Sequence, residues 1–157
     1  MHNLYGPETT IRRSFRGASI LLIDDNPDQC DLIRTVLKGC IPEIGFQVAV
    51  SGEEAFRQLR HCQALKQQLP SLILLDLYLP FAEDGLRFVE QIKRKDSPYR
   101  LIPLTLLSYS AKHQDVLRGY ELGANSYIVK PTDHAQWLQS IQSLRAYWWN
   151  TVTLPLG

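Results

Sequence analysis

Short apolar runs alternate along the chain with segments in which apolar residues recur every three or four positions. The first run, Ser19–Ile23, is followed by Asn26 and Pro27, which suit the N-cap and first turn of a helix. A short apolar run is typical of a buried strand, and the spacing of three and four is typical of an amphipathic helix. This alternation predicts strands at 19–23, 46–50, 72–75, 102–107 and 126–129.

The segments between and after these strands carry helix signals. Ser51 and Glu54 have the spacing of a capping box at the start of the second helix. Gly123 suits the left-handed C-terminal end of the fourth. We expect the third helix at about 84–95 and the fourth at about 111–122. The last helix is expected to bury Leu138, Ile141, Leu144 and Trp148.

The runs 72–75 and 102–107 are apolar without any alternation. A strand that is apolar on both faces is typical of a parallel sheet covered by helices on each side. Five strand-helix units with right-handed crossovers predict an α/β fold. Its expected form is a doubly wound, five-stranded parallel sheet of the flavodoxin-like (βα)5 type. We expect an N-terminal arm at 1–18, one domain at 19–149 and a C-terminal tail at 150–157.

Length and charge narrow the classes of function. The 157 residues suit one domain, and 17 basic against 16 acidic side chains give a net charge of +1. Such a balanced chain has no field to attract nucleic acid or an anionic membrane. No apolar stretch approaches the roughly 20 residues of a membrane span. We therefore expect a cytoplasmic protein with neither a nucleic-acid nor a membrane partner, whose three cysteines are reduced, mostly buried thiols.

Polar side chains follow four of the five predicted strands: Asp24 and Asp25, Asp76, Ser108 and Lys130. Ligands of an open parallel sheet bind at the carboxyl ends of its strands. Each residue alone suits a cap or turn, but together they form one edge. Two like charges about 4 Å apart cost about 4 kcal/mol at an effective dielectric near 20, so the acids need a cation. Carboxylates with a phosphate favour Mg²⁺, and this edge predicts a phosphoryl-transfer site.

At these positions the chain resembles the receiver domain of two-component response regulators. The matching strings are ILLIDDN, LILLDLYLP followed by DG, IPLTLLS and GANSYIVKP, and the likeness runs from Ser19 to Trp149. The resemblance implies that Asp76 accepts a phosphoryl group from a sensor histidine kinase and that the domain then changes conformation. It also implies that Mg²⁺ is bound by Asp24, Asp25, Asp76 and the backbone carbonyl of Tyr78. Ser108 and Lys130 would bind the phosphoryl oxygens, and Tyr127 would be the aromatic residue that switches its position.

The C-terminal string AYWWNTVTLP looks like that of the stand-alone response regulators that serve cyanobacterial phytochromes. This narrower resemblance implies a phytochrome-type kinase and a homodimer, with Tyr147, Trp148 and Trp149 as the contact. Three adjacent aromatics on a helix cannot all face one core, so we expect at least one to be exposed or in a contact. A tail folded back on its own domain is the alternative.

Two features depart from the receiver pattern. The loop between Asp76 and Gly85 is one residue longer than the common receiver loop, which puts its geometry in question. Tyr109 follows Ser108 directly, at a position that is usually small because it borders the phosphorylation site. We expect its ring to narrow the access of water and small phosphodonors.

Three other functions compete with this interpretation. A phosphohydrolase of the haloacid-dehalogenase type wants a second Asp two residues after the nucleophile, and Tyr78 occupies that position. We therefore expect a protein that is not an enzyme. A binding domain with a relic site remains an alternative, although the complete set of acids, hydroxyl and lysine argues against it. A dinucleotide site needs a glycine-rich first turn, whereas residues 24–27 are Asp-Asp-Asn-Pro.

Overall fold

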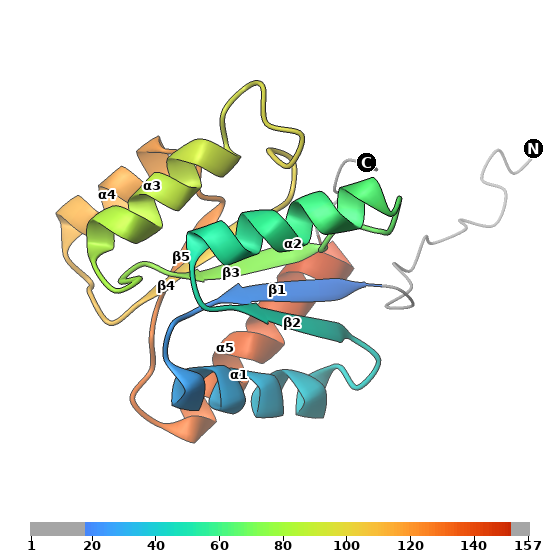
Figure 1. Ribbon diagram of the computed structural model, residues 1–157. Helices are drawn as coiled ribbons and strands as arrows, with labels where there is room; N and C mark the ends of the chain where they lie inside the picture. Colours follow the sequence, from blue (N-terminus) through green and yellow to red (C-terminus); the bar gives the residue numbers. More distant parts are fainter. Residues whose placement is uncertain (1–17, 152–157) are drawn as a thin grey trace, which may run out of the picture.

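The computed structural model describes residues 18–151 and contains one five-stranded sheet with helices on both faces (Figure 1). All neighbouring strands are parallel, in the order β2-β1-β3-β4-β5. This order is that of a doubly wound, flavodoxin-like sheet, and the predicted fold is confirmed. The strands are β1 (Ser19–Ile23), β2 (Gly45–Ala49), β3 (Leu72–Asp76), β4 (Leu104–Ser108) and β5 (Ser126–Val129). The helices are α1 (Pro27–Cys40), α2 (Gly52–Ala64), α3 (Ala82–Ile92), α4 (His113–Glu121), α5 (His134–Arg145) and the π-helix η1 (Ala146–Thr151).

Two hydrophobic clusters cover the two faces of the sheet. In β1, Leu21 and Ile23 pack with residues of α2 and α3, whereas Ile20 and Leu22 pack with residues of α1 and α5. Figure 1 shows α1 and α5 on one side of the sheet and α2, α3 and α4 on the other. All residues of β3 and β4 are buried, which explains why their sequences show no alternation.

The predicted caps hold the ends of several helices. The side chain of Asn26 accepts hydrogen bonds from two backbone N–H groups of the first turn of α1, at 3.0 and 3.3 Å. Ser51 Oγ accepts from the N–H of Glu54 at 3.1 Å, while the Glu54 carboxylate accepts from the N–H of Val50, one residue earlier than in a capping box. Gly123 follows α4 with φ of 111°, which other residues adopt only with strain.

Three strands differ slightly from their predicted ranges. β4 begins at Leu104 rather than 102, because Pro103 has no N–H and the N–H of Ile102 donates to the carbonyl of Tyr99 in a preceding turn. β2 lies one residue earlier than predicted, and β3 includes Asp76. Strand ends depend on pairing with neighbours, which local composition does not specify.

Helices α3 and α4 also differ from their predicted ranges of 84–95 and 111–122. α3 begins at Ala82, because the Asp84 carboxylate accepts the N–H of Phe81 at 3.2 Å and stabilises an earlier first turn. α4 begins at His113 and leaves residues 109–112 as a loop after β4. Residues of this loop form hydrogen bonds with Ser108 and Tyr127.

The apolar stripe of the last helix differs from the predicted one in one position. Trp137, Ile141 and Leu144 are buried against the sheet, while Leu138 is only partly buried beside them. Trp137 was not among the residues predicted to be buried. Trp148, in η1, continues the stripe and packs in the same cluster.

The predicted arm at 1–18 and tail at 150–157 lie outside the described residues, apart from Ala18 and the backbone of the last π-helical turn. No helix within residues 18–151 is long and apolar enough to cross a membrane. Cys30 and Cys62 are buried, Cys40 is partly buried, and all three are free thiols.

Candidate functional site

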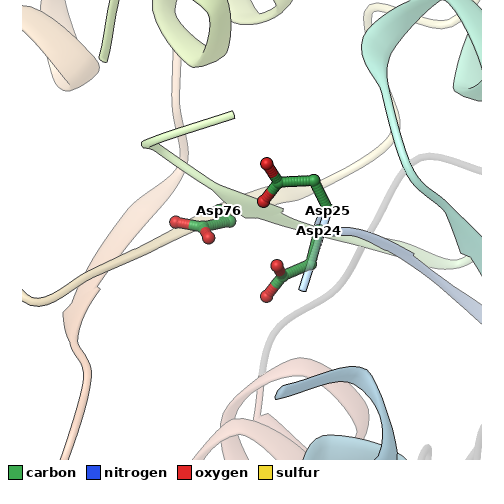
Figure 2. A group of neighbouring side chains, drawn as sticks. All are labelled: Asp24, Asp25 and Asp76. Atoms are coloured by element: carbon green, nitrogen blue, oxygen red, sulfur yellow. The ribbon is translucent and has the colours of Figure 1, made fainter. Parts of the chain in front are cut away.

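The polar residues that follow the strands come together at the carboxyl edge of the sheet. Asp24 and Asp25 follow β1, Asp76 ends the neighbouring strand β3, Ser108 ends β4, and Lys130 follows β5. One carboxylate oxygen from each of the three aspartates lies within 4.8 Å of the others. Figure 2 shows Asp24 and Asp25 extending from the end of β1 toward Asp76 on β3.

The three carboxylates differ in exposure. Asp24 is fully buried, and its Oδ1 accepts the N–H of Asn26 at 2.9 Å. Its other oxygen, Oδ2, is buried without a hydrogen-bond partner among the described residues. Asp76 is buried as well, whereas Asp25 is exposed. The cluster thus has buried acids on its inner side and one acid open to solvent.

Lys130 is the counter-charge of this cluster. Its buried ammonium lies 3.2 Å from Asp76 Oδ2 and 3.7 Å from Asp24 Oδ2. A single lysine therefore faces two buried carboxylates, and the site retains an excess of negative charge. An isolated buried charge is costly, so this excess favours binding of a further cation.

Burial raises the pKa of Asp76 to about 6, although the Lys130 ammonium acts in the opposite direction. The pKa of Asp24 is also raised by burial, against the lowering effects of the Asn26 N–H and of Lys130. In both residues desolvation outweighs the lysine. The two carboxylates are under-compensated in the protein alone.

The residues fit a magnesium ion. Hard carboxylate oxygens are the ligands that Mg²⁺ prefers, and it keeps several waters while binding one or two carboxylates. Asp25 offers a solvent-facing oxygen, and the buried Asp24 Oδ2 has no hydrogen-bond donor within residues 18–151. The backbone of Tyr78 is close by, because its N–H donates to Asp76 Oδ1 at 3.2 Å. A ligand role for the Tyr78 carbonyl stays a prediction.

Ser108 and Tyr127 are linked through a residue that the sequence analysis missed. Ser108 Oγ accepts the N–H of Ser110 at 3.0 Å, and the hydroxyl of Tyr127 donates to the carbonyl of Ser110 at 2.8 Å. Ser110 Oγ donates to Asp115 at the start of α4 at 2.6 Å, and the Tyr78 hydroxyl donates to the same carboxylate oxygen at 3.3 Å. Ser110 thus joins the end of β4 to Tyr127 of β5 and to α4, and Asp115 extends this connection to Tyr78 in the loop after Asp76.

Tyr127 is partly buried in this structure. Its ring packs against the cluster on the α2 and α3 face, and burial raises the pKa of its phenol. The role of Tyr127 as a switch stays a prediction.

The loop after Asp76 is held in place by a close approach of two backbone segments. A Cβ atom on Gly85 would collide with the carbonyl oxygen of Leu77, so no other residue fits there without a backbone shift. This contact packs the first turns of α3 against the residue that follows Asp76. Phe81, in the lengthened part of the loop, is 72% exposed.

Tyr109 borders the site as the sequence predicted. It lines a hollow of about 420 Å³ together with Asp76, Lys130 and Gln29. Its hydroxyl accepts a hydrogen bond from Gln29 Nε2 at 3.0 Å. The sequence analysis missed Gln29, although its position in the first turn of α1 places it at the same edge of the sheet.

The three aromatics expected at a dimer contact differ in their surroundings. Trp148 is only 6% exposed and packs in the core of its own domain, which agrees with the alternative of a tail folded back; its part in a dimer stays a prediction. Tyr147 is 51% exposed, with its ring edge against Trp148. The side chain of Trp149 lies outside the described part of the chain.

Comparisons with known proteins agree with this geometry. The family model of the response regulator receiver domain matches residues 20–142. Response regulator Rcp1 of Synechocystis sp. is 32% identical over 137 residues, which cover 87% of this chain and 92% of that protein. The crystal structure of the phosphorylated cyanobacterial phytochrome response regulator RcpA is 32% identical, with a TM-score of 0.77 over 88% of this chain and 99% of that one. The manganese-bound form of Rcp1 has a TM-score of 0.73 at 30% identity, again over 88% and 99%. The carboxyl edge of the sheet brings together three aspartates, a serine and a lysine, and the family model matches most of the chain. The chain therefore belongs to the response regulator receiver domains.

Proposed function

We propose that Asp76 accepts a phosphoryl group from a histidine residue of a sensor kinase. The observation that carries this proposal is the pairing of Asp76 with Lys130 at 3.2 Å, inside a group of three carboxylates at the edge of the sheet. Phosphorylation by a histidine kinase is the known role of the receiver family to which the chain belongs. The protein acts as a signalling domain.

The transfer step follows from the positions of two side chains. A carboxylate oxygen of Asp76 attacks the phosphorus, the phosphorus–nitrogen bond of the donor breaks, and its electron pair returns to the imidazole. The buried ammonium of Lys130 stabilises the charge on the transferred oxygens. The product is an acyl phosphate on Asp76. Bound Mg²⁺ would neutralise charge on the carboxylates and on the phosphoryl oxygens.

The signal passes from Asp76 through the loop after β4. Ser108 Oγ is now held by the N–H of Ser110, and the carbonyl of Ser110 holds Tyr127. When Ser108 turns its hydroxyl toward a phosphoryl oxygen, it gives up the bond to Ser110. The loop and Tyr127 then rearrange together, which remodels the surface formed by α4, β5 and α5.

The kinase is proposed to be of the phytochrome type. This rests on the likeness to RcpA, a cyanobacterial phytochrome response regulator, which extends over 88% of this chain. Catalysis as a phosphohydrolase is disfavoured, because the position two residues after Asp76 holds Tyr78, whose hydroxyl is bonded to Asp115. The net charge of +1 offers no attraction for nucleic acid.

The protein is also proposed to form a homodimer through the end of its last helix. Tyr147 is 51% exposed and lines an open groove between β5 and α5, beside Val129, which is also exposed. Exposed aromatic and aliphatic side chains on one groove are typical of a contact surface. Trp148 packs in the core cluster and also lines this groove, so Tyr147 is proposed as the side chain that makes the contact.

The kinase assay tests the main proposal. The protein is incubated with a phytochrome-type histidine kinase, ATP and Mg²⁺, and the labelled residue is mapped. We expect label on the protein with this kinase, in a light-dependent amount, and none when Mg²⁺ is chelated. Labelling that is indifferent to chelation would contradict the role of the acids.

Analytical ultracentrifugation at micromolar concentration tests the dimer. Removing the ring of Tyr147 takes away about 2 kcal/mol of side-chain burial, which weakens the dimer by more than tenfold. Tyr147→Ala is therefore expected to sediment as a monomer. Leu65→Ala, at an exposed residue beyond α2, serves as the matched control and is expected to stay dimeric. A monomeric wild-type protein would refute the contact.

A further inference from the structure

The ring of Tyr109 lies across the mouth of the phosphorylation site. Its centroid is 5.1 Å from the ammonium of Lys130, which in turn contacts Asp76. Together with Asp25 and Asp76 it lines the hollow of about 420 Å³ through which a reagent reaches the Asp76 carboxylate. The phenol ring is therefore one of the bulky groups on the path to the acyl phosphate, beside Tyr78 and Pro80.

Little packing holds this ring in place. Tyr109 is 59% exposed, and it belongs to neither hydrophobic cluster. An exposed side chain on a loop is ordinarily free to change rotamer within nanoseconds. Its position must therefore come from the polar contacts that it makes.

Gln29 supplies such a contact from a rigid element. Its Nε2 donates to the Tyr109 hydroxyl at 3.0 Å, across 80 positions of sequence. The backbone N–H of Gln29 is itself held by the Asn26 cap of α1 at 3.3 Å. Its Oε1 is buried and has no hydrogen-bond partner among the described residues, so the amide has given up solvent to reach Tyr109.

We propose that Gln29 and Tyr109 form a latch over the phosphorylation site, which slows hydrolysis of the acyl phosphate and selects against small phosphodonors. This inference rests on the proposed function of Asp76. A kinase domain docks on the protein and uses its own binding free energy to open the latch. Water and a small donor have no such contacts, so they react only in the fraction of molecules in which the ring has moved away.

The protected step is hydrolysis. A water oxygen forms a bond to phosphorus, the bond between phosphorus and the Asp76 oxygen breaks, and its electron pair restores the carboxylate. Inorganic phosphate leaves, and the proton of the water passes to the phosphate or to solvent. A closed latch blocks the approach of the water on the side opposite to the leaving carboxylate.

The expected size of the effect is about tenfold, which corresponds to 1.4 kcal/mol. One neutral hydrogen bond and one cation–π contact at an exposed site together stabilise the closed position by about this amount.

The test uses variants that remove one part of the latch at a time. Gln29→Met keeps the length of the side chain without its amide, Tyr109→Phe keeps the ring without its hydroxyl, and the double variant removes both. Two rates are measured for each: labelling by acetyl phosphate with Mg²⁺, and loss of label after the donor is removed. Gln142→Met and Tyr120→Phe, at exposed positions of α5 and α4, are the matched controls.

Both single variants and the double variant are expected to raise the two rates by the same factor, about fivefold, because each breaks the same hydrogen bond and leaves the cation–π contact in place. Tyr109→Ala is expected to raise them further. Transfer from the phosphorylated kinase is expected to change by less than twofold. The controls are expected to behave as wild type.

Three results would overturn the latch. Rates of Gln29→Met equal to those of wild type would show that the amide does not hold the ring. Multiplicative effects of Gln29→Met and Tyr109→Phe would show that the two side chains act separately. An equal increase in the labelling rate with acetyl phosphate and with the kinase would show that the latch does not select between donors. If wild type takes no label on Asp76 from either donor, the proposed function itself fails, which is a distinct outcome.

Discussion

Two lysines lie at opposite edges of the sheet, and their partners differ in kind. Lys93 follows α3 near the amino ends of β4 and β5, whereas Lys130 follows the carboxyl end of β5. The Lys93 ammonium donates three hydrogen bonds to uncharged oxygens: the carbonyls of Arg100 (3.0 Å) and Ile102 (2.7 Å) and the side-chain oxygen of Asn125 (3.0 Å). Burial lowers the pKa of Lys93 to about 8. All three protons of its ammonium have acceptors.

Lys130 is placed in the opposite situation. It faces two buried carboxylates, at 3.2 Å for Asp76 and 3.7 Å for Asp24, and Asp24 Oδ2 has no hydrogen-bond partner within residues 18–151. One positive charge is set against more than one negative charge. The comparison teaches that a partly buried lysine whose protons all have acceptors fixes a junction of the fold, whereas an under-compensated cluster is a site that awaits a cation and a phosphoryl group.

Replacing each lysine by methionine is expected to give the largest difference between the two sites. Lys130→Met removes the cation beside Asp76 and should lower phosphotransfer by roughly 100-fold, as the loss of one charge-stabilising group does in other sites. Lys93→Met should leave phosphotransfer unchanged but lower the free energy of unfolding by about 1 kcal/mol, because the partly buried carbonyl of Ile102 loses its donor.

Phosphotransfer kinetics and urea unfolding of both variants measure this separation, with Lys95→Met at an exposed position as control. A Lys93→Met protein that loses phosphotransfer while it stays folded would break the comparison.

The free energy of unfolding is expected to depend on pH, because the carboxylate of Asp76 is buried with too little positive charge beside it. The pKa of Asp76 is about 6 in the folded protein, above its ordinary value of 3.8, so the folded state binds the proton more tightly. The stability contributed by this proton is present below pH 3.8 and is lost as the pH rises to about 6. The difference corresponds to roughly 3 kcal/mol, and solvent access through the hollow reduces the expected loss to about 2 kcal/mol.

Urea unfolding in EDTA between pH 4 and 7 checks this loss. Asp76→Asn carries no titrating group there and should be the more stable protein at pH 7. A wild-type protein whose stability is flat over this range, or equal to that of Asp76→Asn, would show that the cluster is not under-compensated.

Binding of Mg²⁺ is expected to depend more on the exposed acid than on the buried one. Asp25 faces solvent, whereas Asp24 is committed to the Asn26 N–H and to Lys130. Asp24→Ala should weaken Mg²⁺ binding by a factor on the order of ten, and Asp25→Ala should weaken it by more. Titration of Mg²⁺ by calorimetry or by a change in fluorescence gives both affinities, and equal affinities for wild type and both variants would contradict the assignment.

The smallest expected effect concerns the connection between Ser108 and Tyr127. Ser110→Ala removes the hydrogen bond to Asp115 at 2.6 Å but keeps the backbone bonds to Ser108 and Tyr127. The free energy of unfolding should fall by about 1 kcal/mol. The chemical shifts of α4 should change more than those of α1, and equal changes in the two helices would show that Ser110 does not anchor α4.

The edge of the sheet that carries the site could be predicted because parallel strands end there together. Asp24, Asp76, Ser108 and Lys130 each follow an apolar run, and the topology alone brings those ends into contact. The left-handed conformation of Gly123 could be predicted too, because it depends on the residue type alone.

Contacts between side chains far apart in sequence could not be predicted. Gln29 meets Tyr109 across 80 positions, and Lys93 meets Asn125 across 32, because each pair depends on how α1 or α3 packs on the sheet. Trp137 was overlooked because it lies next to Leu138 on α5, and only the packing decides which of two adjacent apolar residues faces the core.

The most direct test of the account is the site of phosphorylation. Wild type and Asp76→Asn are incubated with a phytochrome-type histidine kinase, ATP and Mg²⁺, and the acyl phosphate is located by mass spectrometry after borohydride reduction. The account predicts a single modified residue, Asp76, in wild type and no kinase-dependent label in Asp76→Asn. Label at the wild-type rate in Asp76→Asn, or on another residue of wild type, would contradict it.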